Sequence, residues 1–343
     1  MNRTVLVVGC VIAIWLLTSC DESFSPSAPF EPRMAVYSML STDRDTQYVR
    51  VYSTYNPQDN DPSKNQDEIP VTDAQVTISQ QGGPTFTLRP VTVDRPDKSR
   101  YLSDINAYFA YPFRPEKGKT YTLTVSSPAR GTVTGSVTIP NKGSIIPYNT
   151  FVLSSPYHGT DDYGVAATLS PEAKAFLVRF YVDYISPLPG GGYQPKRFEV
   201  PLRRYVVSRY REEYKDIYPQ PVSRTTPTNP AQSRYRELKS EERILYTRGA
   251  YAFLLGSLYD IEGCGVRFKQ AVFYLIQFDE PLWNYYNVAN NLGERYSVRT
   301  DEPDYTNIKG GFGVFGSATI DSTVWPLPEK IPPPPAQGTA GCQ

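Results

Sequence analysis

Apolar and polar side chains alternate in short runs over residues 34–140, which is the period of half-buried β-strands. The alternating positions are largely Thr, Val and Tyr, as in residues 48–52 and 120–125. Turn-forming clusters such as residues 81–84 separate about seven of these runs, and no helical period appears among them. The pattern predicts an N-terminal immunoglobulin-like β-sandwich over residues 34–140.

The pattern changes after a Pro- and Gly-containing boundary at residues 140–147. Strand patterns follow at residues 176–185, 197–207, 268–278 and 313–324, and helical spacing appears at 249–262 and 281–288. The chain is therefore expected to be mainly β, with a second β-rich (α+β) domain over residues 147–325 that contains one or two short helices.

The N-terminus has the layout of an exported lipoprotein precursor. Arg3 precedes an apolar run at residues 5–17, which at about a dozen residues is short for a bilayer span of ~20. The run ends at Cys20 in the motif Leu-Thr-Ser-Cys, which resembles a bacterial lipobox. The resemblance implies that residues 1–19 are a signal peptide and that Cys20 is lipidated. The alternative is an uncleaved signal anchor, or an ordinary signal peptide with a chance cysteine.

The segments next to both termini are rich in proline. Residues 20–33 are expected to form a lipidated, flexible tether, and residues 326–343 a Pro-rich disordered tail. Asp21 and Glu22 directly follow Cys20 and resemble a surface-export signal of Bacteroidota lipoproteins. The sequence leaves open whether the protein faces the cell surface or the periplasm.

Cleavage before Cys20 would leave Cys264 and Cys342 as the two other thiols of the mature chain. In an oxidising envelope compartment these two can form a disulfide that fastens the tail to the second domain. The alternative is a pair of unpaired thiols.

Composition argues against several classes of function. The chain has 35 Lys and Arg against 35 Asp and Glu, which gives none of the basic excess that general nucleic-acid binding needs. A single His argues against His-dependent catalysis and a His-rich metal site. We expect no catalytic set, no metal site, no cofactor and no nucleic-acid partner.

Two groups of side chains are candidates for ligand binding. Arg and Tyr interleave in a charged insert near residues 197–248, with Arg204, Tyr205 and Arg209 as the candidates for binding an anionic glycan or lipopolysaccharide. A solvated insert, in which Arg pairs with acids and packs on Tyr, explains the same pattern. The second group, Trp283, Tyr285 and Tyr286, has the aromatic character that suits sugar or peptide recognition.

Three stretches carry a family resemblance. They are residues 70–78, residues 118–125 with the closing 137–140, and residues 305–316. With the lipobox, they resemble the Bacteroidota lipoproteins of the domain-of-unknown-function 4249 family, over roughly residues 30–325. The resemblance implies an envelope lipoprotein, often associated with an outer-membrane TonB-dependent receptor, and supplies no catalytic residues.

The closing motif of this resemblance reads best as a structural element. Gly310, Gly311, Gly313 and Gly316 allow positive φ or close backbone approach, and Asn307 is expected to bond a neighbouring backbone amide. A tight bulge or sheet edge is the favoured interpretation, with a binding role as the alternative.

Taken together, the sequence predicts a non-catalytic, lipid-anchored outer-membrane lipoprotein. Its expected role is binding or scaffolding beside a TonB-dependent receptor, with a glycan or peptide as ligand. Two alternatives stay open: a cell-surface hydrolase that uses two carboxylates, for which no particular pair stands out, and a purely structural or adhesive envelope protein.

Overall fold

The computed structural model describes residues 30–56, 68–99, 101–157, 162–207, 213–224, 241–291 and 305–331. Within these ranges the protein is mainly β, as predicted, with strands β1–β17 and helices α2–α4. None of the helices in these ranges is long and apolar enough to cross a membrane. Cys20, Arg209 and Cys342 lie outside the described residues, so the predictions that involve them stay predictions.

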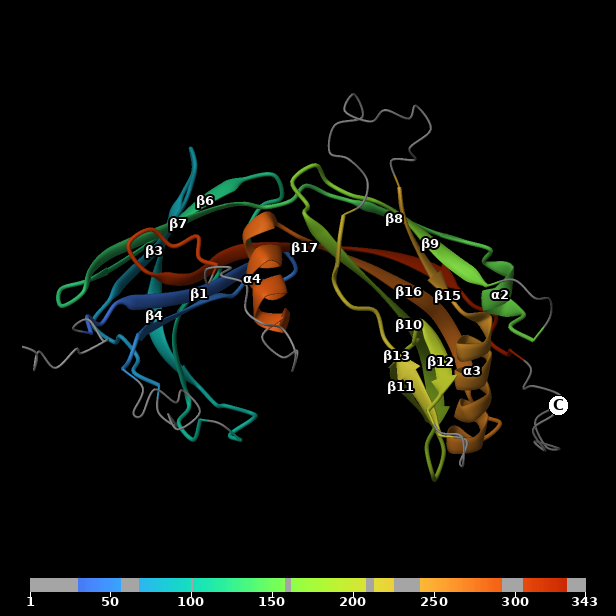
Figure 1. The fold of residues 1–343 in the computed structure, drawn as a ribbon. Helices are drawn as coiled ribbons and strands as arrows, with labels where there is room; N and C mark the ends of the chain where they lie inside the picture. Colours follow the sequence, from blue (N-terminus) through green and yellow to red (C-terminus); the bar gives the residue numbers. More distant parts are fainter. Residues whose placement is uncertain are drawn as a thin grey trace, which may run out of the picture.

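The first half of the molecule is built from the seven strands that the alternating pattern predicts (Figure 1). They are β1 (Met34–Ser41), β2 (Gln47–Ser53), β3 (Gln75–Gln80), β4 (Thr85–Val93), β5 (Ile105–Ala110), β6 (Thr120–Ser127) and β7 (Gly131–Thr138). Their order is β1-β2-β5-β4-β3-β6-β7. The N-terminal part of β4 pairs with β3 and its C-terminal part with β5, so β4 connects the two layers. One side of each strand contributes to a single apolar core.

The second half contains the remaining strands and two of the helices. The strands are β8 (Ser144–Tyr148), β9 (Tyr163–Thr168), β10 (Ala175–Pro187), β11 (Tyr193–Glu199), β12 (Arg203–Val206), β13 (Tyr214–Ile217), β14 (Val222–Ser223), β15 (Glu242–Tyr246), β16 (Arg267–Phe278) and β17 (Phe312–Pro326). The helices are α2 (Phe151–Ser154) and α3 (Arg248–Glu262), and α4 (Glu280–Asn291) lies between the halves (Figure 1). The sequence predicts one continuous strand at 197–207. This prediction is wrong, because β11 and β12 are two separate strands there.

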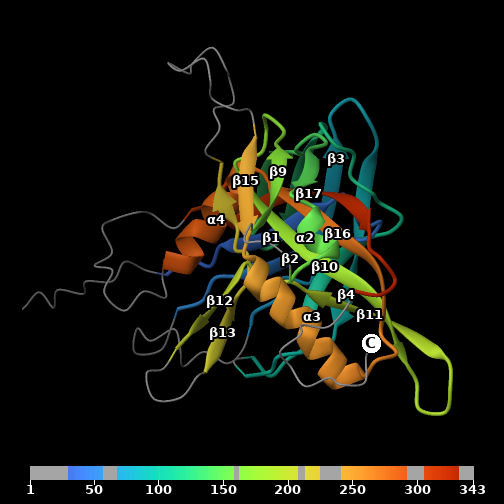
Figure 2. The ribbon, with the colours of Figure 1, turned by 90° about the vertical axis from the view of Figure 1, so that its right-hand side faces the viewer.

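Three buried tyrosines form the centre of the second core. Tyr163, Tyr246 and Tyr251 pack with Phe180 and Phe273, with ring centroids of contacting pairs 4.5–5.8 Å apart. The Tyr251 hydroxyl donates to the Leu153 carbonyl at 2.8 Å and the Tyr246 hydroxyl to Val178 at 3.3 Å, which satisfies both buried hydroxyls. This cluster joins the β9–β15 layer to the β10–β16 layer, and α3 lies alongside (Figure 2).

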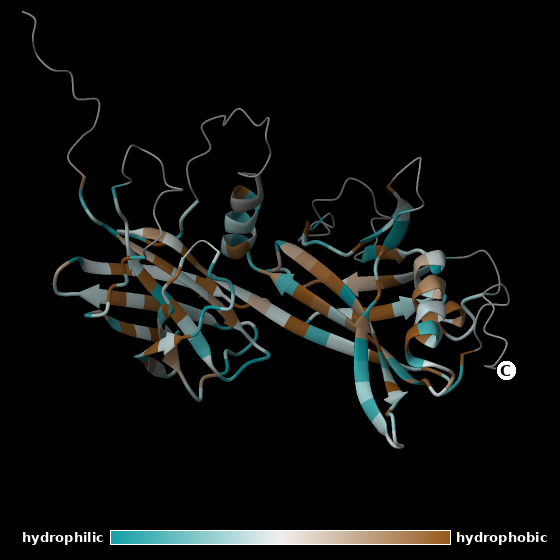
Figure 3. Ribbon diagram, turned by 90° about the horizontal axis from the view of Figure 1, so that it is seen from below, coloured by the Kyte–Doolittle hydropathy of each residue, from teal (hydrophilic) through white to brown (hydrophobic). Residues whose placement is uncertain are grey.

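Strand β17 belongs to both halves. Residues 312–318 pair in parallel with β1, and residues 318–326 pair antiparallel with β16. The two partners lie on opposite edges of β17, and Ala318 is the residue at which one ladder ends and the other begins. The halves therefore share one continuous sheet. Figure 3 shows hydrophilic and hydrophobic residues alternating along its strands.

The closing motif packs in the first half, although the sequence analysis assigns it to the second domain. Ile308 and Phe315 are buried in the first core. Asn307 bonds both backbone groups of Phe315: its amide donates to the carbonyl at 2.7 Å, and the Phe315 amide donates to its oxygen at 2.9 Å. The Asn307 side chain thus takes the place of a neighbouring strand on the free edge of β17.

Gly310 and Gly313 have positive φ, at 84° and 103°. A Cβ at Gly313 would collide with the Val36 carbonyl oxygen on β1, and one at Gly311 would lie 2.5 Å from the Met34 carbonyl oxygen. The glycines therefore allow β17 to run unusually close to β1.

A polar network fixes the linker between the halves. The buried Asp321 carboxylate accepts from Lys117 at 2.7 Å and from the Gly143 amide at 3.0 Å. The side-chain amide of Gln277, which is also buried, donates to the Asn141 carbonyl at 3.1 Å. Thr319 donates to the Pro140 carbonyl at 2.7 Å. Residues 140–143 are thus fastened to β16 and β17 by bonds from both strands.

The residues after β17 pack more tightly than the sequence predicts. Leu327 and Ile331 are buried in the second core, and the Tyr259 hydroxyl donates to the Ile331 carbonyl. The prediction of an unpacked tail from residue 326 is therefore wrong for residues 327–331, because two apolar side chains among the prolines find a core. Cys264 is disulfide-bonded, and its predicted partner, Cys342, lies outside the described residues.

We predict that Gly313→Ala destabilises the protein by roughly 2–5 kcal/mol, because it combines a left-handed backbone with a collision against Val36. Gly190→Ala is the matched control, since Gly190 also has positive φ (95°) but open space around it. The control should cost only roughly 1–2 kcal/mol. Urea unfolding measures both, and equal losses would show that the approach to β1 is unimportant.

Candidate functional site

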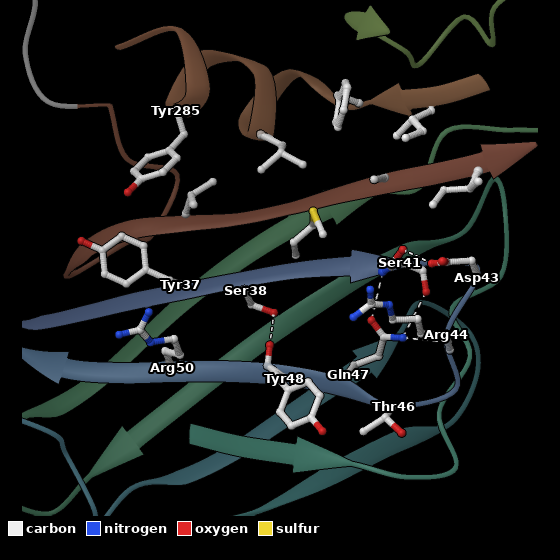
Figure 4. A pocket seen from close by; sticks show the side chains of 17 residues that line it. Tyr37, Ser38, Ser41, Asp43, Arg44, Thr46, Gln47, Tyr48, Arg50 and Tyr285 are labelled. Atoms are coloured by element: carbon white, nitrogen blue, oxygen red, sulfur yellow. Dashed lines mark hydrogen bonds between the residues drawn. The ribbon is translucent and has the colours of Figure 1, made fainter. Parts of the chain in front are cut away.

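A groove of about 650 Å³ lies where the two halves meet. It is open on one side, and its walls come from β1, β2, β16, β17, α4 and the β1–β2 loop (Figure 4). Its floor is the outer face of the shared sheet, opposite the core of the first half. The volume falls within the range of ~300–1,000 Å³ that is typical of small-molecule sites.

The sheet register explains the apolar floor. Met39 lies opposite Gly316 and Ser41 opposite Ala318 across the β1–β17 ladder, while Ile320 lies opposite Ile276 across the β17–β16 ladder. Residues paired in this way share one face of the sheet. The apolar lining consists of Met39, Ile276, Phe278, Leu282, Val314, Ala318 and Ile320. Met39 remains 49% exposed, so a large apolar side chain faces open space in the floor.

Helix α4 forms the upper wall because Gly316 lets it approach. A Cβ at Gly316 would lie 2.7 Å from the Cβ of Leu282, in the first turn of the helix. One turn further, the Tyr285 ring meets the Tyr37 ring edge-on at 5.9 Å. This aromatic pair closes one end of the groove (Figure 4).

Asp279 begins α4 as its N-cap. Its carboxylate accepts from the Leu282 amide at 2.9 Å and from the Ser317 hydroxyl at 2.9 Å, and the residue is only 3% exposed. Burial raises the pKa of Asp279 to about 7, although both hydrogen bonds favour the charged form, and neighbouring Glu280 adds a smaller repulsion. The cap of the groove wall therefore changes charge near neutral pH.

The β1–β2 loop forms the other end of the groove and is held by Gln47. This buried side chain accepts from the Ser41 amide at 2.9 Å, and it donates to the carbonyls of Ser41 at 3.1 Å and Arg44 at 2.9 Å. The Ser41 hydroxyl donates to the Asp43 carboxylate. In the part of the chain that the structure describes, the guanidinium of Arg44 and the hydroxyl of Thr46 have no hydrogen-bond or ion-pair partner.

Arg50, by contrast, has partners on two of its three guanidinium nitrogens. Its guanidinium donates to Glu68 at 2.8 Å and to the Tyr52 hydroxyl at 3.1 Å. Desolvation lowers the pKa of Arg50, but its bonds to Tyr52 and Glu68 outweigh this effect and raise it. Arg50 thus holds the edge of the groove through Tyr52 and Glu68.

The structure does not bring the predicted binding residues together. Of the aromatic group on α4, Tyr285 lines the groove, whereas Trp283 and Tyr286 stack on each other at 5.8 Å and do not. Arg204 lies on β12, next to α3, where it pairs with Asp216 at 2.7 Å and lies 3.6 Å above the Phe253 ring. Tyr205, on the same strand, is 43% exposed. The contacts of Arg204 match the solvated-insert interpretation.

Sequence reasoning missed Tyr37, Met39, Arg44 and Tyr48. One signal was present in β1, which carries large apolar side chains at both odd and even positions. Such a pattern indicates that both faces of the strand make apolar contacts. The partners across the groove come from residues 276–320, and this pairing cannot be inferred from the local pattern.

The lining contains a single carboxylate, Asp43. Hydrolysis by two acids needs a pair separated by ~5–10 Å across the scissile bond. The groove therefore offers apolar contact, four aromatic rings and hydrogen-bond donors in the loop at one end.

A family model described as "Domain of unknown function (DUF4249)" matches residues 21–323. A search of curated proteins finds no match. Among solved structures, the C-terminal globular domain of an oligosaccharyltransferase from Pyrococcus abyssi matches with 8% identity and a TM-score of 0.16. The match covers 62% of this chain and 47% of that one. Similarity at this level supports no conclusion about fold or function.

We predict that Asp279 makes the stability of the protein depend on pH. The unfolded chain releases this proton near pH 4 and the folded chain at about 7, so between these values the folded state binds more protons and its stability falls as pH rises. Asp279→Asn keeps an acceptor for the Leu282 amide and removes the charge. The free energy of unfolding of Asp279→Asn minus that of wild type should therefore increase by roughly 2–4 kcal/mol from about pH 5 to about pH 8.

Urea unfolding at both pH values measures this gain. Asp260→Asn, which alters an exposed carboxylate on α3, is the control and should show no comparable gain. A difference between Asp279→Asn and wild type that is the same at both pH values would rule out the titration of Asp279.

Proposed function

Because the chain belongs to the DUF4249 family, which has no assigned function, we propose a function from the groove and the N-terminal sequence. The protein is a lipid-anchored outer-membrane lipoprotein of the cell envelope. It is non-catalytic, and it binds a ligand in the groove between its halves beside a TonB-dependent receptor.

The groove is the observation that carries the binding role. It combines an exposed apolar floor with a rigid end that has unengaged donors, and it lies on a shared sheet whose geometry both halves fix. A preformed site on rigid strands limits the ordering cost of binding. The single carboxylate in the lining favours binding over the hydrolase alternative.

The anchor rests on the sequence. The short apolar run and Cys20 match the layout of a lipoprotein precursor, and residues 20–33 supply a tether to the first described strand. Several acyl chains together hold a protein stably at a membrane, because each buried CH₂ contributes ~0.8 kcal/mol. The association with a receptor is implied by the family resemblance.

We predict that Cys20→Ser abolishes labelling by radioactive palmitate and releases the protein from the membrane fraction. Cys10→Ser is the matched control, since it changes a cysteine within the predicted signal peptide and should leave labelling intact. If the Cys20→Ser chain is still labelled and sediments with membranes, the anchor proposal is wrong.

The receptor association is tested by affinity purification from solubilised outer membranes of cells that express the tagged protein. We expect a TonB-dependent receptor to be enriched over an unrelated lipoprotein with the same tag. Absence of enrichment would favour the structural or adhesive alternative.

A further inference from the structure

The distribution of polar groups in the groove restricts what it can bind. Ser38 donates to the Tyr48 carbonyl at 2.9 Å, Ser41 is bonded to Asp43, and Gln47 has its bonds within the loop. These groups are already satisfied by the protein itself. A sugar, with a hydroxyl on most carbons, would lose its water along the floor without gaining partners there.

Two polar side chains without a partner among the described residues, Arg44 and Thr46, lie together at one end, and the Tyr285 hydroxyl, also without one, lies at the other. Arg44 and Thr46 lie in the β1–β2 loop, and Gln47 fixes that loop by accepting from Ser41 and donating to the Arg44 carbonyl. A guanidinium presents paired N–H donors that match the two oxygens of a carboxylate. Asp43, the acid of the lining, is bonded by the Ser41 hydroxyl. The end of the groove is therefore suited to one anionic group.

The rest of the groove is suited to hydrocarbon. Ile320 lies beside the loop, and from there the floor continues over Ala318 and Met39 to the Tyr37–Tyr285 pair. It meets no charged side chain until Arg50, which Glu68 engages. A ligand that matches this pattern has its polar atoms at one end and apolar atoms along its length. An extended peptide fits less well, because its backbone carries polar groups at every residue.

We propose that the groove binds the acyl chain of a free fatty acid, with its carboxylate on Arg44 and Thr46. The proposal rests on the binding role inferred above and specifies its ligand. The aliphatic chain runs from Ala318 over Met39 toward Tyr37 below helix α4, and no covalent step is involved.

The test uses the full chain carrying Cys20→Ser, so that no detergent competes for the groove. Isothermal titration calorimetry measures binding of dodecanoate, of dodecanol and of a free-carboxyl Leu-Leu-Leu peptide. We expect dodecanoate to bind saturably at one site, dodecanol about tenfold or more weakly, and the peptide more weakly still. Shortening the fatty acid should weaken binding by about twofold to fourfold per methylene.

Two groove variants locate the site. Arg44→Gln should weaken dodecanoate about tenfold to hundredfold while leaving dodecanol unchanged. Met39→Glu places a charge in the floor and should weaken both, and folding should survive because the side chain is half-exposed. Arg114→Gln, an exposed arginine outside the groove, is the matched control and should bind as wild type does.

Equal affinity for dodecanoate and dodecanol, an unchanged affinity in Arg44→Gln, preferential binding of the peptide or no saturable binding would each overturn the proposal. Receptor enrichment from membranes is measured separately. If enrichment persists while fatty acid does not bind, the ligand assignment fails and the proposed association stands.

Discussion

The structure depends on the hydrogen-bond ladders of β17. This strand pairs with β1 on one edge and with β16 on the other, and the two ladders meet at Ala318. Backbone hydrogen bonds in a ladder are directional and closely spaced. Because β17 belongs to the sheet of each half, it fixes the orientation of one half relative to the other. The linker network around Asp321 and Gln277 reinforces this relation. The groove lies on the outer face of the sheet, where pairing of β17 with β1 ends and its pairing with β16 begins.

Close approach at two glycines gives the groove its shape. Gly313 brings β17 against β1, and Gly316 brings the first turn of α4 against β17. The buried N-cap Asp279 then fixes where the helix begins, at the energetic cost of placing a carboxylate where it is poorly solvated. Because α4 packs on the backbone at Gly316, which has no side chain, the neighbouring Met39 side chain remains half-exposed in the groove.

The sequence predicted what is local and missed what depends on distant pairing. Period-two alternation indicated about seven strands in the first half, and apolar spacing identified α3 to within a residue. The groove was not predicted because Tyr37 and Val314 meet through a register that no short window contains. Arg204 looked available in the sequence, but its partner Asp216 lies on the neighbouring strand. Leu327 was assigned to a loose tail because prolines dominate its surroundings, yet Leu327 and Ile331 together anchor the segment in the second core.

The position of β17 along the chain also bears on how the protein is made. It is the last strand among the described residues, and both apolar cores include side chains from residues 308–331. Neither half can close its sheet while that segment is still being synthesised, so the pairings that complete the fold have large sequence separations and form late. Because both cores take side chains from this one segment, its late synthesis delays the completion of both halves alike.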